Sequence, residues 1–370
     1  MNNSQLNIED AVAERYSQAS QEAEAALCCP VDYDTRWLEV LPAELIDRDY
    51  GCGDPSQWVQ QGEHVLDLGS GGGKICYIAS QIVGADGSVT GVDMNEDMLA
   101  LARQYQNEIC GKIGWDNITF HKGKIQDLKL DMQEFENWLQ NHPATDSKSW
   151  LQAEQQAEKL RLTKPLIADN SIDVVVSNCV LNLVNPNDRI RLFAELYRVL
   201  KPGGRAVISD IVSNQPVPAV MQNDATLWSG CISGAFEDRN FIQAFLNAGL
   251  GKVEILARQS EPWKIVEGIE FRSMTLRAWK PLGLKDETNA GESVIYRGPW
   301  QEVVDDHGNT LTRGKRVTIS RGQMREYECA PYGADLILLN DEGKFMESDQ
   351  SSNTSALPIA DSCSIGSDCC

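Results

Sequence analysis

One stretch decides the fold of this chain: Val65-Leu66-Asp67-Leu68-Gly69-Ser70-Gly71-Gly72-Gly73. An apolar run that ends on an acidic residue and continues into glycines predicts a strand over residues 64–67 and a tight turn over 69–73. An amphipathic helix pattern begins directly afterwards, at Lys74–Val83. Glycines in such a turn let a ligand approach the backbone, and a helix N-terminus favours negative charge. The stretch therefore predicts a ligand site where a strand meets a helix.

The same strand-then-helix pattern continues along the chain. We expect strands over 88–93, 118–121, 172–178 and 205–210, and helices over 96–108 and 189–200. Ile172–Asn178 is a continuous apolar run, which is typical of a strand buried on both faces. Strands that alternate with helices form parallel βαβ units. The predicted fold class is α/β, with a doubly wound sheet.

Charge and composition exclude several functions. The chain of 370 residues carries 54 acidic and 33 basic side chains, an excess of 54 − 33 = 21 negative charges. Such a surface repels phosphate backbones, so we expect no nucleic-acid partner. Residues 1–20 are polar and helix-like, unlike a signal peptide, and no apolar run reaches 18 residues, so we also expect no membrane span. These features predict a cytoplasmic protein, which we expect to be a monomer.

The positions of two acidic residues indicate which ligand the glycine turn binds. Nucleotide fingerprints place glycines against a pyrophosphate, with the acid at the end of the next strand. Here Asp67 precedes the turn, where it would disfavour a pyrophosphate but could hold an amine, and Asp93 follows 26 residues later, where it can accept from ribose hydroxyls. This arrangement predicts a site for S-adenosylmethionine (SAM). The residues assigned to it are Asp67, Gly69, Ser70, Gly71, Asp93, Met94, Ile125 (against the adenine) and Asn178.

The chain contains 11 cysteines, which in a long chain without secretion signals indicates metal, metalloid or redox chemistry. No Cys-x-x-Cys or His-x-x-x-His pair occurs, so we expect no structural zinc and no metal cofactor. Cys52 lies between two glycines before the sheet, Cys179 directly follows the fourth strand, and Cys231 comes after the fifth. Each alone could be a packed core residue. Together they are expected at the sheet edge where the methyl donor binds.

At this point the chain resembles the arsenite methyltransferases. The matching motifs are Tyr-Gly-Cys-Gly (50–53), the Asp67 glycine turn, Ser-Asn-Cys-Val (177–180) and Trp-x-x-Cys-x-x-Gly-Ala (228–235). The resemblance extends from about residue 28 to 340. It implies that Cys52, Cys179 and Cys231 bind or deliver As(III), and that Cys28 or Cys29 forms a disulfide with Cys52 during turnover. The stretch Cys-Cys-Pro-Val-Asp-Tyr-Asp (28–34) resembles the corresponding sequence in a bacterial branch of this family that is linked to arsenosugar synthesis.

Thiolate is the natural ligand of the soft As(III) centre, whose lone pair could accept the methyl group without a general base. The expected function is methyl transfer from SAM to thiol-bound As(III), presented as a thiol conjugate, with thioredoxin or glutathione as the reductant. Two alternatives remain open. The first is a SAM-dependent methyltransferase of a small organic metabolite, whose cysteines would be spectators. The second is a thiol-rich protein that sequesters As(III), although such a protein would not need a methyl-donor site.

The expected organisation has four parts. Residues 1–60 form an N-terminal helical and thiol-containing segment with a mobile cysteine loop. Residues 61–282 form a class I SAM-methyltransferase (Rossmann-like) domain that also binds As(III), interrupted by a charged surface helix within 131–164. Residues 283–345 form a small β-rich domain, and residues 346–370 are a disordered tail with Cys363, Cys369 and Cys370.

Overall fold

The computed structural model describes residues 8–24, 27, 31–283, 291–306, 308–329 and 331–345. The chain divides into two compact units, Met1–Pro281 and Leu282–Cys370. The helices that precede the first strand belong to the larger unit. None of the helices in the described ranges is long and apolar enough to cross a membrane.

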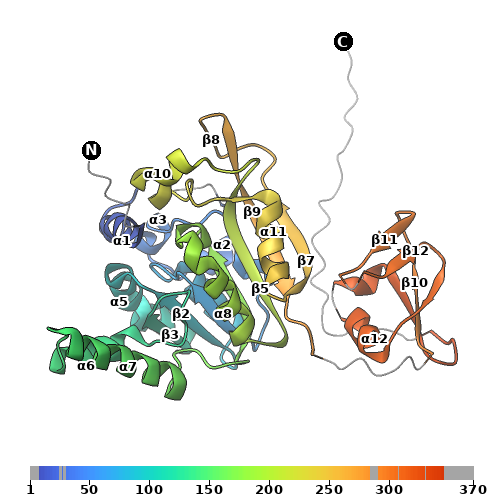
Figure 1. The fold of residues 1–370 in the computed structure, drawn as a ribbon, viewed down its shortest axis with the longest axis horizontal. Coiled ribbons are helices and arrows are strands. Elements are labelled where there is room, and N and C mark those ends of the chain that lie inside the picture. Colours follow the sequence, from blue (N-terminus) through green and yellow to red (C-terminus); the bar gives the residue numbers. More distant parts are fainter. Residues whose placement is uncertain are drawn as a thin grey trace, which may run out of the picture. The chain divides into compact units, whose positions relative to one another are not determined.

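The larger unit is built on a nine-stranded sheet in the order β3-β2-β1-β4-β5-β9-β7, with β6 paired to β5 and β8 to β9 (Figure 1). The strands β1 to β5 run parallel, and β9 and β7 close the sheet antiparallel. This is the predicted doubly wound sheet. Its strands are β1 (His64–Leu68), β2 (Ser88–Asp93), β3 (Ile118–Lys122), β4 (Ile172–Asn178), β5 (Leu200–Ser213), β6 (Phe236–Glu237), β7 (Gly251–Arg258), β8 (Lys264–Val266) and β9 (Ile269–Trp279).

Helices cover both faces of the sheet, because alternate residues of each strand point to opposite sides. Leu66 and Ile208 face one core with α8 and α11, which Figure 1 shows on the same side of the sheet. Val65 and Val207 face a second core with α4 and α5. The helices of this unit are α1 (Ile8–Ala19), α2 (Thr35–Leu38), α3 (Ala43–Asp47), α4 (Lys74–Val83), α5 (Glu96–Ile113), α6 (Met132–Asn141), α7 (Ser147–Thr163), α8 (Arg189–Val199), α9 (Ala219–Gln222), α10 (Ala225–Ser229) and α11 (Asp238–Asn247).

The order of the strands determines where a ligand can bind. The chain passes outward from β1 through β2 to β3, then crosses back to β4 on the other side of β1. At this reversal the carboxyl ends of β1 and β4 lie side by side, with Leu68 opposite Ser177. Crevices at such switch points are the usual ligand sites of open α/β sheets. The glycine turn follows β1 and Cys179 follows β4, so both lie at this crevice.

Two differences from the sequence-based expectation concern β5 and the segment 131–164. The strand expected over 205–210 is longer and runs from Leu200 to Ser213. The helix α8 ends at Val199, and the stretch Lys201-Pro202-Gly203-Gly204 that follows forms the irregular start of β5. The pairing of β5 with β4 shifts register there. The single surface helix expected within 131–164 is a pair, α6 and α7, which Figure 1 shows next to each other. Neither difference alters the sheet edge that carries the site.

The described residues of the smaller unit include two small sheets and one α-helix. β10 (Ser293–Tyr296) pairs with β13 (Arg316–Thr318) and β14 (Leu336–Leu339), and β11 (Glu302–Val304) pairs with β12 (Thr310–Thr312). The helix α12 (Arg321–Glu328) was not expected, and Tyr327 from it is buried in the unit's core. The expected tail over 346–370 lies outside the described residues.

Candidate active site

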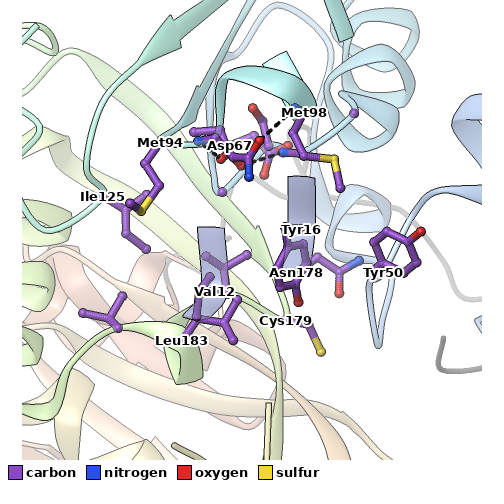
Figure 2. Close-up of a pocket in the computed structure, with 18 of the residues that line it drawn as sticks. Val12, Tyr16, Tyr50, Asp67, Met94, Met98, Ile125, Asn178, Cys179 and Leu183 are labelled. Carbon is purple, nitrogen blue, oxygen red and sulfur yellow. Dashed lines mark hydrogen bonds between the residues drawn. The ribbon is translucent and has the colours of Figure 1, made fainter. Parts of the chain in front are cut away.

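A cavity opens at the switch point between β1 and β4. Its lining comes from the glycine turn, the ends of β1, β2 and β4, and the helix α1 (Figure 2). All the residues that sequence analysis assigned to the donor site line this cavity: Asp67, Gly69, Ser70, Gly71, Asp93, Met94, Ile125 and Asn178. Of the cysteines in the described ranges, Cys179 lines it.

The glycine turn has a backbone that side chains would not tolerate. Gly69, Gly71 and Gly73 have φ of 71°, 50° and 85°, in the left-handed region that glycine adopts readily. A Cβ at Gly69 would lie 2.4 Å from a methyl carbon of Val180. The turn is fastened to β2, since Gly69 N donates to the carbonyl oxygen of Val92 at 2.8 Å. The turn therefore keeps its backbone next to the cavity.

Asp67 is a buried carboxyl group in the cavity with a strongly raised pKa. The residue is 2% exposed, and burial raises the pKa of its carboxyl to about 7. The thiol of Cys76 donates to Oδ2 at 3.3 Å and opposes that rise, whereas the negative charges of Asp49 and Asp93 add to it. A cationic group of a ligand would favour the ionised form. Asp67 can thus hold an ammonium.

The rest of the cavity offers complementary polar and apolar contacts. Burial raises the pKa of Asp93, and its carboxylate accepts from Asn95 N at 2.8 Å and from Gly71 N at 2.9 Å. Ile125 supplies a mostly buried apolar wall. The hydroxyl of Ser70 is buried and has no hydrogen-bond partner among the described residues, which leaves a polar atom for a ligand to satisfy. These groups fit the amine, ribose and adenine of SAM.

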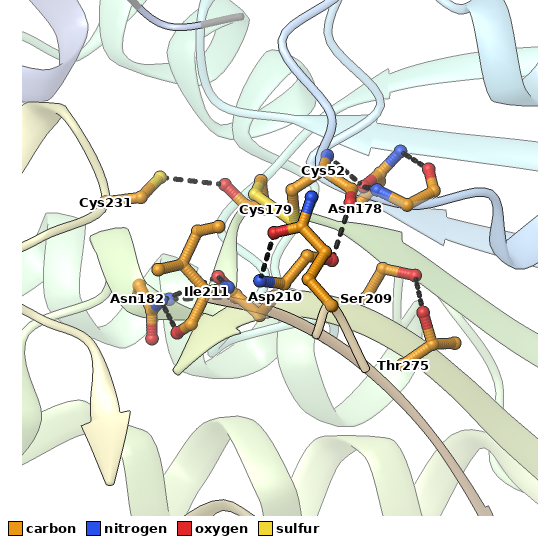
Figure 3. The surroundings of a disulfide bond; sticks show 12 residues. Cys52, Asn178, Cys179, Asn182, Ser209, Asp210, Ile211, Cys231 and Thr275 are labelled. Carbon is orange, nitrogen blue, oxygen red and sulfur yellow. Dashed lines mark hydrogen bonds between the residues drawn. A yellow bond between two sulfur atoms is a disulfide. The ribbon is translucent and has the colours of Figure 1, made fainter. Parts of the chain in front are cut away.

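Three cysteines from distant parts of the chain meet beside this cavity (Figure 3). Cys52 and Cys179 are joined by a disulfide with a Cα–Cα distance of 5.8 Å. The thiol of Cys231 donates to the carbonyl oxygen of Cys179 at 3.3 Å. All three are at most 5% exposed. The structure therefore gathers the three residues for which the resemblance implied As(III) binding.

The disulfide differs from the pairing that the resemblance implied. That pairing joined Cys52 to Cys28 or Cys29, both of which lie outside the described residues. A sulfur atom forms one disulfide at a time, so the structure holds a state in which Cys52 is bonded to Cys179 instead. Of the remaining cysteines in the described part of the chain, Cys76 and Cys110 are buried and Cys329 is exposed.

The loops that carry two of these cysteines have strained backbones. Cys179 and Cys231 have φ of 62° and 60°, a region that residues with a Cβ rarely adopt. The conformation is held by neighbouring contacts: Cys179 N donates to Ser209 O at 2.8 Å, and the Cys231 loop packs so tightly that a Cβ at Gly234 would lie 1.9 Å from Asn182 O. The backbone of both residues is therefore held in place by its surroundings.

A buried polar cluster lies under these loops. Asp210, at 0% exposed, accepts from Asn182 Nδ2 at 2.7 Å and from Ile211 N at 2.8 Å. Burial raises the pKa of Asp210 to about 7, although backbone N–H groups that donate to the carboxylate, among them Ile211 N and Asn182 N, and the charge of Arg189 lower it. Arg189 in turn donates to Gly234 O at 2.6 Å. The cluster ties the loop after Cys179 to the loop after Cys231.

The helix α1 contributes to the site in a way that the sequence did not predict. Val12 and Tyr16 line the cavity, and the hydroxyl of Tyr16 forms a hydrogen bond with the Cys231 side chain; burial raises the pKa of Tyr16. Arg15 donates to Ser229 Oγ at 3.1 Å, two residues before Cys231. The polar, helix-like pattern of residues 1–20 indicated a helix, but no local signal indicated where it would pack.

Known proteins similar to this chain agree with the geometry. A family model described as a methyltransferase domain matches residues 60–165 and 152–249, and one described as a domain of unknown function matches 285–358. The arsenite methyltransferase of Aquipseudomonas alcaligenes is 31% identical over 317 residues, 82% of this chain and 80% of that protein. The arsenite methyltransferase of Homo sapiens is 32% identical over 299 residues, 79% of this chain and 68% of that protein.

A solved structure gives the same result. The arsenic (III) S-adenosylmethionine methyltransferase from Chlamydomonas reinhardtii aligns with a TM-score of 0.57 and 25% identity, covering 86% of this chain and 99% of that one. The relatives, the doubly wound sheet and the donor cavity beside a cysteine cluster lead to one conclusion: the chain is a SAM-dependent methyltransferase that belongs to the arsenite methyltransferase family.

Proposed function

We propose that this enzyme transfers methyl groups from SAM to As(III) held by the thiolates of Cys52, Cys179 and Cys231. The observation that carries the proposal is the meeting of these residues, from three distant segments, at the edge of the cavity that contains Asp67 and Asp93. Cys179 connects the cavity with the cysteine cluster, since it lines the cavity and is bonded to Cys52. The names of the relatives support arsenite as the substrate.

On the side of the methyl donor, we assign to the protein residues only the binding of SAM. SAM, when bound, supplies an electrophilic methyl group on a sulfonium sulfur. We assign Asp67 to its ammonium, Asp93 to its ribose hydroxyls and Ile125 to its adenine. Donor held by these residues would lie in the cavity that Cys179 also lines, next to the thiol cluster. Positioning of two reactants in this way can lower a barrier by roughly 7–11 kcal/mol.

On the acceptor side, the cysteines must first be reduced. Three thiolates can then bind one As(III), which prefers soft sulfur ligands. The arsenic keeps a lone pair directed away from the three sulfurs, and this pair forms the As–C bond. No proton leaves the arsenic, so the reaction requires no general base. The described residues that line the cavity include no histidine, in agreement with such a reaction.

A thiol cycle completes the proposal. Methylation formally oxidises arsenic to the pentavalent level, and two thiolates can return the two electrons by leaving the arsenic and joining as a disulfide. Cys52 is one partner; Cys28, Cys29 or Cys179 is the other, and the disulfide between Cys52 and Cys179 supports the last choice. Thioredoxin or glutathione then reduces the disulfide. Both sulfurs are thereby returned to the arsenic site.

The proposal is tested by incubating the full chain with As(III), SAM and a thiol reductant, and identifying the products by mass spectrometry. We expect methylated arsenicals and S-adenosylhomocysteine. Substitution of Cys231 by Ser should abolish both, whereas Cys110→Ser is a matched control, because Cys110 is also buried but belongs neither to the cavity lining nor to the cysteine cluster. As(III) bound without SAM turnover would indicate a sequestering protein instead. Full activity of Cys231→Ser on an organic acceptor would indicate a small-metabolite methyltransferase.

A further inference from the structure

All hydrogen-bonding positions of the Asn178 side-chain amide are occupied by groups of the protein. Its Oδ1 accepts from Cys52 N at 2.8 Å and from Gly53 N at 3.1 Å. Its Nδ2 donates to Gly53 O at 2.6 Å and approaches the hydroxyl of Tyr33 at 3.1 Å. An amide has two donor hydrogens and two acceptor lone pairs, so these four contacts exhaust it. Asn178 lines the donor cavity, but its hydrogen bonds are directed to the Cys52 loop (Figure 3).

The loop fits closely against this amide. A Cβ at Gly51 would lie 2.1 Å from Asn178 Nδ2, and a Cβ at Gly53 would lie 2.5 Å from Ser209 Oγ. Only glycine allows the backbone on either side of Cys52 to approach so near. The glycines that flank Cys52 in the sequence are therefore explained by the contact that the loop makes with the sheet.

A second anchor holds the same loop from another strand. Ser273, on β9, is 6% exposed and its hydroxyl donates to Cys52 O at 2.5 Å. Ser273 is not among the residues that line the donor cavity. The backbone N–H and C=O of Cys52 are thus both fixed, the first by Asn178 and the second by Ser273. Either anchor can be removed separately.

We propose that Asn178 is a positioning residue that holds the Cys52 thiol beside Cys179, and that its amide serves this loop rather than the methyl donor. The inference rests on the proposed function, because the position of Cys52 matters to catalysis only if Cys52 binds arsenic. Asn178 directly precedes Cys179 in the chain, so one short segment at the end of β4 supplies one arsenic ligand and places a second.

The test uses an equilibrium that needs neither arsenic nor SAM. The full chain is equilibrated in glutathione redox buffers, remaining thiols are alkylated, and the Cys52–Cys179 disulfide is quantified by peptide mass spectrometry. In Asn178→Ala, the loss of the loop contacts should lower the equilibrium constant for this disulfide roughly tenfold or more. Ser273→Ala should lower it by a smaller factor. Ser177→Ala is the matched control, since its buried hydroxyl also makes one backbone hydrogen bond, to Leu68 O at 2.8 Å, away from the loop.

The second readout is SAM binding by calorimetry. We expect the dissociation constant of Asn178→Ala to stay within about twofold of that of the unaltered chain, because the amide has no capacity left for the donor. If the alanine variant does not fold, Asn178→Asp has the same shape but cannot donate to Gly53 O, and should also weaken the disulfide. An unchanged disulfide equilibrium in a folded variant, or a large loss of SAM affinity, would overturn the assignment. A failure to methylate arsenic would refute the proposed function without altering this equilibrium.

Discussion

Asp67→Asn gives the most informative perturbation of the donor site. Burial raises the pKa of Asp67 from 3.8 to about 7. The difference is 7 − 3.8 = 3.2 units, and one unit corresponds to about 1.36 kcal/mol. The carboxylate therefore destabilises the folded state by up to about 4 kcal/mol above pH 7. Because a buried amide also loses hydration, we expect Asp67→Asn to gain roughly 1–3 kcal/mol of unfolding free energy at pH 8.

The sign of the pH dependence follows from proton linkage. Between about pH 4 and pH 7 the folded protein keeps the proton on Asp67 while the unfolded chain has lost it. The folded state binds more protons in this window, so its stability falls as the pH rises, and the loss is complete above pH 7. The two proteins should therefore have their smallest stability difference near pH 4 and their largest near pH 8.

SAM affinity should respond in the opposite direction. An ammonium favours the ionised carboxylate, so binding to the unaltered chain should tighten as the pH rises through 7, whereas binding to Asp67→Asn should be weaker and should lack the part of this pH dependence that Asp67 contributes. Urea unfolding from pH 4 to 8 and calorimetry with SAM measure both effects. Equal pH slopes for the two proteins, in stability and in SAM affinity, would refute the role assigned to Asp67.

Three further substitutions test other parts of the site. Asp93→Ala should weaken SAM binding by about 1–3 kcal/mol in calorimetry, since it removes a hydrogen-bonded acceptor of the cavity; unchanged affinity would contradict the ribose assignment. Cys179→Ser should abolish methylation of As(III) while SAM still binds, as measured by product mass spectrometry and calorimetry; retained activity would make the thiol a spectator. Gly234→Ala should destabilise the larger unit by about 1–3 kcal/mol, because the new Cβ would lie 1.9 Å from Asn182 O; an unchanged urea midpoint would show that the loop can move aside.

The parts of the fold that local patterns determine were predicted well. Lys74–Val83, Ser88–Asp93 and Ile172–Asn178 have the bounds that the sequence indicated, because a turn or a periodic apolar pattern marks each end. The helix after β2 is longer than expected and ends at Ile113, where Gly114 adopts a left-handed C-cap. That glycine is visible in the sequence, and it could have given the correct end.

Tertiary contacts explain most of what was missed. Tyr16 reaches the cavity only because α1 packs beside α10, a contact between residues about two hundred positions apart. Asn178 lines the cavity, as its place after β4 predicted, but the sequence could not show that its side-chain amide would also bond to the Cys52 loop. In the smaller unit, Ser320 and Gln323 form a capping box that starts α12, and this signal was present in the sequence.

Arsenic K-edge X-ray absorption on the reduced full chain, loaded with one equivalent of As(III), tests the central claim most directly. We expect a first shell of three sulfur atoms, which falls to two in Cys231→Ser and stays at three in Cys110→Ser. A shell of two sulfurs with oxygen ligands in the unaltered chain, or three sulfurs that persist without Cys231, would contradict the proposed three-thiolate site.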